Sequence, residues 1–382
     1  MNWSVLAALA FAFALNVPAA IPPKSAECLT CHDDKGAGFQ NSVHGSFSCT
    51  DCHTTINQYP HSANGATVSK FRCDTCHKDP VAGVAASVHS SPSAQACQGC
   101  HSDAHAILPA SDPKSGTYAS NLPRTCGTCH GDAKFAKQHK ISEVYSLYID
   151  SIHGFALTKD GLLVAASCSS CHGSHKILSK TNPASRTNPA NIAETCGKCH
   201  AGPTKDFMAG IHGQGMAMGD TRAPVCTNCH TAHQISSPCE QAWQTKTGAT
   251  CGGCHQEKLE TYRDTFHAQV SALGYVDTAH CWDCHGFHNI RPSNDQKSTV
   301  AKANLEATCG KCHSGVTKSF ITYQPHADRH NRHEYPMLWA SSIMMNMLLA
   351  SVLGFFALHT LLWLMRSLSE RRKGSPLEGE NQ

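Results

Sequence analysis

The chain has 382 residues, and with 23 Cys and 27 His these two residue types fill about one position in eight. Large apolar side chains make up about 18% of the stretch from Lys24 to His330, near the level at which chains stay disordered. This composition excludes an ordinary soluble enzyme core, so something other than side chains must fill the interior. The formal net charge of +3 is too small to indicate a nucleic-acid partner.

Nearly all the cysteines belong to one motif, CxxCH, which occurs eleven times and contains 22 of the 23 cysteines. A shuffled chain of this composition would contain roughly 0.1 such motifs, so the composition does not explain the count. The motifs begin at Cys28, Cys49, Cys73, Cys97, Cys126, Cys168, Cys196, Cys226, Cys251, Cys281 and Cys309.

In each motif the two cysteines can form thioether bonds to one haem, and the histidine that follows can bind the iron. The pattern therefore predicts eleven covalently bound c-type haems. The second cysteines are Cys31, Cys52, Cys76, Cys100, Cys129, Cys171, Cys199, Cys229, Cys254, Cys284 and Cys312. The motif histidines, which are the predicted first iron ligands, are His32, His53, His77, His101, His130, His172, His200, His230, His255, His285 and His313.

Three other uses of paired cysteines explain the pattern less well. Zinc ribbons need two CxxC pairs for each metal and do not require His directly after every second Cys. A disulfide framework does not explain the histidines either. A thioredoxin-like redox pair occurs once in a domain rather than eleven times.

The histidines outside the motifs recur at fixed offsets, and the motifs alternate between two kinds. After odd-numbered motifs a His follows at +12, +13 or +23, often in an SxHG context and with an aromatic residue five positions earlier. After even-numbered motifs it follows at +3 or +4, with Ile two positions later, except for one case at +8. The first group is His44, His89, His153, His212, His267 and His326, and the second is His61, His105, His175, His233 and His288.

Eleven candidate second ligands for eleven motifs predict two axial histidines on every iron. Methionine is scarce between the apolar ends of the chain, which favours low haem potentials. His139, at +9 from His130, competes with His153 for one position. Which iron each second ligand serves stays open, because ligation can cross between modules.

The alternation defines a repeat of 45 to 70 residues with two haems, followed by a linker rich in Pro, Ser, Thr and Asn. We expect a mainly α and irregular fold, a haem-cored array of two-haem repeats with one C-terminal transmembrane helix. Short helices are expected just before the second-ligand histidines, as at 143–152 and 259–267. Linkers such as 177–193 and 290–298 should be irregular.

Both ends of the chain are apolar. Residues 1–19 are typical of a signal peptide, and a retained N-terminal anchor is the alternative. Residues 336–365 are long enough to cross a bilayer, with a Trp near each end. Basic residues after the span favour a cytoplasmic tail at 366–382, so we expect a periplasmic haem domain at 20–335 anchored in the inner membrane.

Three residues lie outside this scheme. His359, inside the predicted span, could bind a b-type haem or face a quinone site with a partner subunit, or it could contact a neighbouring helix. His280 adjoins a motif and is expected to be a surface group or to support a ligand. Cys239, the cysteine outside the motifs, is expected to be a buried free thiol rather than part of an intermolecular disulfide.

The paired motifs, with their SxHG and CxxCHxxH contexts, resemble the doubled-CxxCH and cytochrome c3-like families of multihaem cytochromes c between Cys28 and His326. The resemblance implies bis-histidine haems in close contact that move electrons through the periplasm. The C-terminally anchored form resembles subunits that work beside a membrane cytochrome b in quinone-linked oxidoreductases and periplasmic hydrogenases of anaerobic bacteria.

Together these patterns predict an electron carrier without catalytic residues, placed between an inner-membrane quinone-linked or hydrogenase-type complex and periplasmic cytochromes or redox enzymes. The alternative is a multihaem reductase of the nitrite, hydroxylamine or tetrathionate type, which needs one iron with an open position. The best candidate for such an open position is the haem served by His61 or His153, where the spacing is irregular. A mainly structural role in a larger assembly is a third interpretation.

Overall fold

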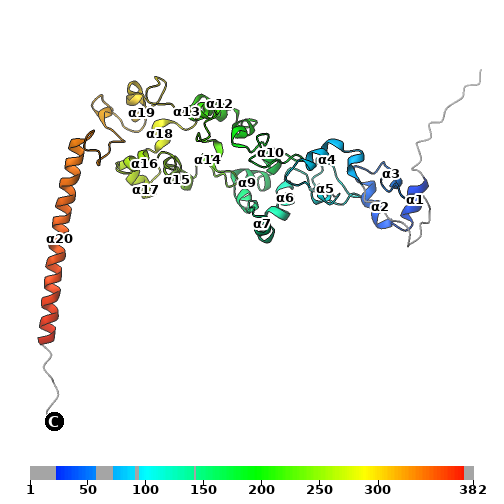
Figure 1. The fold of residues 1–382 in the computed structure, drawn as a ribbon, viewed down its shortest axis with the longest axis horizontal. Helices are drawn as coiled ribbons and strands as arrows, with labels where there is room; N and C mark the ends of the chain where they lie inside the picture. The colour runs from blue at the N-terminus through cyan, green and yellow to red at the C-terminus, as the bar shows by residue number, and fades with distance from the viewer. Residues whose placement is uncertain (1–22, 57–71, 91–93, 142, 374–382) are drawn as a thin grey trace, which may run out of the picture. The chain divides into compact units, whose positions relative to one another are not determined.

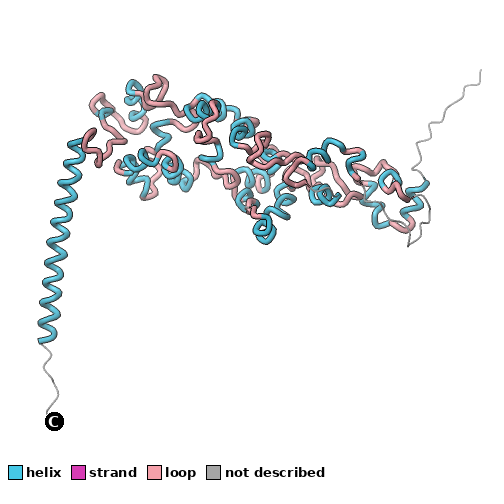
Figure 2. Tube along the Cα trace, viewed as in Figure 1, coloured by secondary structure: helices cyan, strands magenta, loops and turns pink. Residues whose placement is uncertain are grey.

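The structure is a computed structural model that describes residues 23–56, 72–90, 94–141 and 143–373, and these residues form helices and loops without β-strands (Figure 2). The chain divides into two compact units, Met1–Ser237 and Pro238–Gln382. Both contain short helices joined by long connecting segments (Figure 1). The mainly helical and irregular fold expected from the sequence is confirmed for this part of the chain.

The described helices of the first unit are α1 (Pro23–Leu29), α2 (Asp33–Gln40), α3 (Cys49–Cys52), η1 (Cys73–Thr75), α4 (Lys78–Ala85), α5 (Ala94–His101), α6 (Leu122–His130), α7 (Ala133–His139), α8 (Tyr145–Ile149), α9 (Ile152–Thr158), α10 (Cys168–His172), η2 (Pro189–Asn191), α11 (Ile192–Gly197), α12 (Ala201–Ala209), α13 (Ile211–Ala217) and α14 (Cys226–His230). Those of the second unit are α15 (Gln241–Gly252), α16 (Gln256–Arg263), α17 (Phe266–Ala272), α18 (Cys281–His285), η3 (Lys302–Asn304), α19 (Leu305–Gly310), η4 (Phe320–Thr322) and α20 (Pro336–Lys373). The η elements are single turns of 3-10 helix.

Side chains supply little core. Most buried side chains in the described ranges are small or polar, and Leu157 is the largest that is fully buried. The buried apolar residues are Ala136, Leu157, Ile192, Ala193, Val225, Ala268 and Ala301. Burial on this scale cannot offset the conformational entropy that a chain of this length loses on folding.

Three linkers adopt the same hydrogen-bonded loop, each just before an odd-numbered motif. In the first copy, Asn121 Nδ2 donates to the carbonyl of buried Ser115 at 2.8 Å, and Thr125 Oγ1 donates to the carbonyl of Gly116 at 2.6 Å. The equivalent residues are Ser185, Asn191 and Thr195, then Ser298, Asn304 and Thr308. The linker 290–298 is irregular as expected, whereas the expected irregular linker 177–193 ends in η2 and the first residues of α11. The hydrogen bonds of the loops fix where the following motif begins.

The helices expected at 143–152 and 259–267 are interrupted. Helices α8 and α16 end before the second-ligand histidine, and Ser151 and Thr265 then cap the new helices α9 and α17. His153 and His267 therefore lie in the first turn of a second helix, not at the end of the first. The physical reason for the interruption is the capping hydroxyl. It accepts a hydrogen bond from a backbone amide of the following helix, so a new helix starts there and the preceding one does not continue.

Helix α20 contains the expected span of 336–365 and is long and apolar enough to cross a membrane. It continues to Lys373, into the expected tail, where Arg366 and Glu370 form an ion pair of 2.8 Å. Its side chains are exposed, and the His359 ring lies 6.4 Å from that of Phe355, one turn away. The expected signal peptide at 1–19 lies outside the described residues.

Candidate functional site

Within the described ranges, eight motif histidines each face one histidine from outside the motifs. In every pair the ring centroids are 5.9 to 6.2 Å apart. With the motif residue first, the pairs are His53–His105, His77–His44, His101–His175, His130–His89, His172–His233, His200–His153, His285–His326 and His313–His267. Each pair lies within a single unit.

This separation is the one that two imidazoles need when they bind one metal ion from opposite sides. A metal–imidazole bond is about 2 Å long and the bonding nitrogen lies roughly 1 Å from the ring centre, which places the two centroids about 6 Å apart. The paired histidines therefore fit the axial positions of a haem iron, with the CxxC cysteines of the same motif beside them for covalent attachment.

Burial keeps these imidazoles in the form that binds metals. It is the main cause that lowers the pKa of many of them, and a nearby imidazole is a second cause. The histidines affected are His53, His89, His101, His153, His172, His233, His267, His285 and His326. A lowered pKa favours the neutral ring, and only the neutral ring can ligate iron.

The second histidine comes from a neighbouring module. His44 follows the first motif but faces His77 of the third, and His105 follows the fourth motif but faces His53 of the second. All eight pairs obey one rule: an odd-numbered motif takes its partner from earlier in the chain, and an even-numbered motif takes it from later. Each pair thus ties together two modules that are separated along the sequence.

The competition between His139 and His153 is resolved by the geometry. His153 faces His200 of the seventh motif at 6.0 Å, whereas His139 lies beside Phe135 with ring centroids 4.2 Å apart. The remaining ligand candidates of the described ranges, His32, His212, His230, His255 and His288, also interact with other residues. His61 lies outside these ranges.

We call the segments that follow odd-numbered motifs odd-type segments and those that follow even-numbered motifs even-type segments. In odd-type segments a hydroxyl two residues before the second-ligand histidine fixes the backbone. Ser42 Oγ accepts from the amide of His44 at 3.1 Å, and Ser151 Oγ accepts from the amide of Gly154 at 3.1 Å. Ser87 and Thr265 occupy the same position in two further copies. The Ser of the SxHG pattern is therefore a local cap that positions the imidazole.

In even-type segments the second-ligand histidine is positioned by a residue with a left-handed backbone conformation directly after the motif histidine. The backbone angle φ is +83° at Gly173 and +76° at Gly286, and it is also positive at Ser102 and Thr231. This conformation ends the helix of the motif and turns the chain sharply, so that a second His follows within a few residues. After several odd-numbered motifs a new helix begins directly instead, as α4 does after His77 and α12 does after His200.

A repeated backbone hydrogen bond joins the two types of segment. The amide of Val43, just before His44, donates to the carbonyl of Ile107, two residues after His105, at 2.9 Å. The same bond joins Val88 to Ile177 at 2.8 Å and Ile152 to Ile235 at 2.9 Å. The Ile after the even-type histidine therefore marks the point at which the second ligands of two successive motifs are held together.

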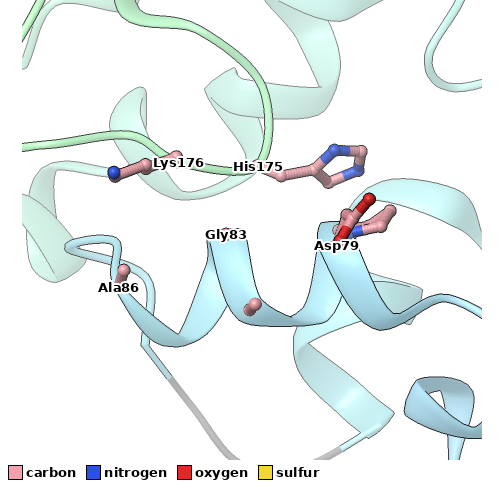
Figure 3. A pocket seen from close by; sticks show the side chains of 7 residues that line it. Asp79, Gly83, Ala86, His175 and Lys176 are labelled. Carbon is pink, nitrogen blue, oxygen red and sulfur yellow. The ribbon is translucent and has the colours of Figure 1, made fainter.

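Helix α4 shows how closely these segments pack. The loop with His175 and Lys176 crosses the helix at Gly83, and the two side chains extend in opposite directions (Figure 3). A Cβ on Gly83 would lie 3.2 Å from the Cβ of His175, so only glycine leaves this contact unstrained. A cavity of about 480 Å³ lies between this loop and α4, and its lining runs from Asp79 to Ala86 on the helix and includes His175 and Lys176 (Figure 3).

The motif cysteines make consecutive motifs spatial neighbours. Within each odd–even pair the first cysteines are close enough for their thiols to hydrogen-bond: Cys28–Cys49, Cys73–Cys97, Cys126–Cys168, Cys196–Cys226 and Cys251–Cys281. The second cysteine of an even motif lies near the next odd motif in Cys52–Cys76, Cys100–Cys126, Cys171–Cys199 and Cys284–Cys309. The first eight motifs therefore form an unbroken series in the first unit, and the last three do so in the second.

Two tyrosines anchor even-numbered motifs to the segments that precede odd-type histidines. Tyr148 donates its hydroxyl proton to the carbonyl of Ala166 at 2.7 Å, and Tyr262 donates to that of Ala279 at 2.6 Å. Each acceptor lies two residues before the first cysteine of a motif. Burial raises the pKa of both tyrosines, so the hydroxyls remain donors.

We expect Tyr148→Phe to lower the free energy of unfolding by about 1 kcal/mol, because one half-buried carbonyl loses its hydrogen bond. Haem content should not change, since the aromatic ring remains and Phe occurs naturally at this position of two other copies, at 39 and 207. Guanidinium unfolding of the purified protein measures the difference. The control is Tyr323→Phe, at a side chain that is 57% exposed, and an equal loss there would contradict the assignment.

For two single residues the structure decides between the expected alternatives or contradicts the expectation. Of the two expected roles of His280, the surface group is excluded: the residue is 5% exposed, it stacks on Trp282 with ring centroids 4.3 Å apart, and its amide donates to Asp283 at 2.7 Å. It supports the start of α18 and hence the tenth motif. Cys239 is exposed rather than buried, because it follows Ser237 and Pro238 in a turn before α15.

Comparison of the chain with protein-family models, with curated proteins and with solved structures finds no match. The case for a function therefore depends on the motifs and on the geometry of the described residues. Three features were not predicted from the sequence: which histidine each motif pairs with, the left-handed residues after even-numbered motifs, and the tyrosine hydrogen bonds. The available signal for the sharp turn was the small residue directly after three even-numbered motifs, Ser102, Gly173 and Gly286, whereas Thr54 and Thr231 follow the other two.

Proposed function

We propose that this protein is a membrane-anchored multihaem c-type cytochrome that carries electrons between an inner-membrane quinone-linked or hydrogenase-type complex and periplasmic acceptors. The observation that carries the proposal is the set of eight histidine pairs with a constant separation near 6 Å, each uniting a CxxCH histidine with a second histidine. Haem supplies one-electron oxidation and reduction when it is bound.

The side chains of the chain hold and insulate the cofactors in this proposal. Cysteine pairs attach each haem, and paired imidazoles fill both axial positions, so no iron of a described pair is left open to a substrate. The neighbouring motif cysteines keep successive attachment points close together, as at Cys28 and Cys49. Short separations between successive sites are what electron tunnelling along a chain requires.

The apolar helix α20 supports an anchor at the C-terminal end. An integral cytochrome b-type subunit is the partner that we propose for it, with His359 as a candidate contact to a b-type haem or quinone. The periplasmic orientation and the cleavage of residues 1–19 are parts of the same proposal, and they rest on the sequence pattern of the two ends.

Low-temperature electron paramagnetic resonance of the oxidised protein tests the proposal, with c-type haem quantified on the same sample. We expect about eleven haems per chain, as the eleven motifs imply, and only low-spin ferric signals. A reproducible high-spin signal near one haem per chain would reveal a vacant position and favour the reductase alternative. Protein without covalent haem would overturn both.

A further inference from the structure

The eight histidine pairs differ in one respect, the angle between the two ring planes. Three pairs are nearly parallel: His172–His233 at 2°, His53–His105 at 13° and His101–His175 at 16°. Four are strongly rotated: His153–His200 at 44°, His267–His313 at 52°, His44–His77 at 60° and His89–His130 at 74°. The pair His285–His326 is intermediate at 38°.

The angle follows the segment that supplies the second histidine. In the three aligned pairs this residue lies on the sharp loop after an even-numbered motif, a few residues beyond a left-handed residue such as Gly173. In the rotated pairs it lies in an odd-type segment, two residues after the hydroxyl position. His326 is the informative case, because it serves an even-numbered motif from an odd-type segment and its ring is not aligned.

Local backbone geometry is a sufficient cause for this division. The helix of the motif does not divide the pairs: His77 stands at the N-cap position of the next helix, but His130, of the most rotated pair, closes the last turn of α6 as His172 closes that of α10. The loop and the capped turn that supply the second histidine, by contrast, present their imidazoles from different backbone directions. Because these contexts repeat along the chain, the ring angles repeat with them.

We propose that the protein contains two electronic classes of iron site, aligned and rotated, which alternate along the chain within the described pairs. This inference rests on the proposed function, since it concerns the irons that the paired histidines would hold. Each axial imidazole interacts with the iron d orbital perpendicular to its plane. Aligned rings raise the same orbital and separate it from its partner, whereas perpendicular rings raise both and leave them close in energy.

The difference has a direct spectroscopic signature in the low-spin ferric state. A large separation between the two orbitals gives a rhombic spectrum with a moderate highest g value. A small separation gives a broad signal with a larger highest g value. The oxidised protein should therefore show both kinds of low-spin signal, and each kind should belong to a defined set of motifs.

The test compares two single-ligand variants of the full-length holoprotein by electron paramagnetic resonance. His233→Ala removes a second ligand from the most nearly parallel pair, and His89→Ala removes one from the most rotated pair. We expect His233→Ala to reduce the rhombic signal by one haem equivalent and to leave the broad signal unchanged. His89→Ala should do the reverse, and each variant should gain one high-spin iron.

The spectrum of the unsubstituted protein tests the same inference without any risk to folding. A single low-spin class in that spectrum, or loss of the same signal in both variants, would overturn the two-class assignment while leaving the bis-histidine carrier intact. Absence of covalent haem would instead overturn the proposed function itself. Both low-spin signals, with opposite losses in the two variants, would support the assignment.

Discussion

Protein produced without covalent haem is expected to lose most of its helical circular dichroism and to expand in solution. The described residues bury few apolar side chains, and four of the seven are alanine. The histidine pairs near 6 Å are the sites at which, in the proposed function, bound haem would link one module to the next. Without haem the hydrogen bonds between modules would remain as the main links.

Circular dichroism and small-angle scattering of haem-free and haem-loaded protein measure this effect. A matched control replaces both cysteines of one motif, Cys168→Ser with Cys171→Ser, which should remove a single haem and leave most of the helical signal. A compact haem-free chain with native helicity would contradict the view that haem supplies the core.

Among Gly→Ala substitutions in the odd-type segments, Gly154→Ala is expected to cause the largest loss of stability. A Cβ at this position would overlap the backbone carbonyl of Tyr148 and lie 2.9 Å from the Cα of Ile149. Backbone atoms cannot move aside as a flexible side chain can, so α9 must shift, and His153 shifts with it. We expect the unfolding free energy to fall by about 1–3 kcal/mol.

The shift should also separate His153 from His200, so one iron per chain should become high-spin. Ala268 occupies the equivalent place after His267, and its buried side chain is accommodated there. Ala268→Gly is therefore the control, and it should leave every second ligand in place. Unchanged low-spin spectra for Gly154→Ala would show that the close packing at Tyr148 does not position the histidine.

The sequence predicted much of the candidate site because its chemistry is local. The CxxCH motif and the offset of the next histidine need only a few consecutive residues, and in the described pairs eight candidate second ligands face a motif histidine. The partner of each could not be predicted. His105 is near His101 in sequence and faces His53, and no periodicity of the chain encodes that choice.

The helical class was also predictable because it depends on local sequence. The residues at which individual helices begin and end were not predictable. Ser151 divides one expected helix in two because its hydroxyl competes for the backbone, which hydrophobic patterns do not report. The polar linkers were expected to be irregular, but the Asn121 amide and its equivalents hold them in one repeated loop. Apolar periodicity is a weak guide in a chain whose described residues bury so few apolar side chains.

With the export and haem binding that we propose, the partner rule would also set an order of assembly from the N-terminus. When the third motif emerges, its partner His44 has already crossed, so the site can be completed at once. The second motif must wait for His105, and the sixth must wait for His233. Even-numbered sites therefore pass through a period with a single protein ligand, in which they depend on timely export of the following module.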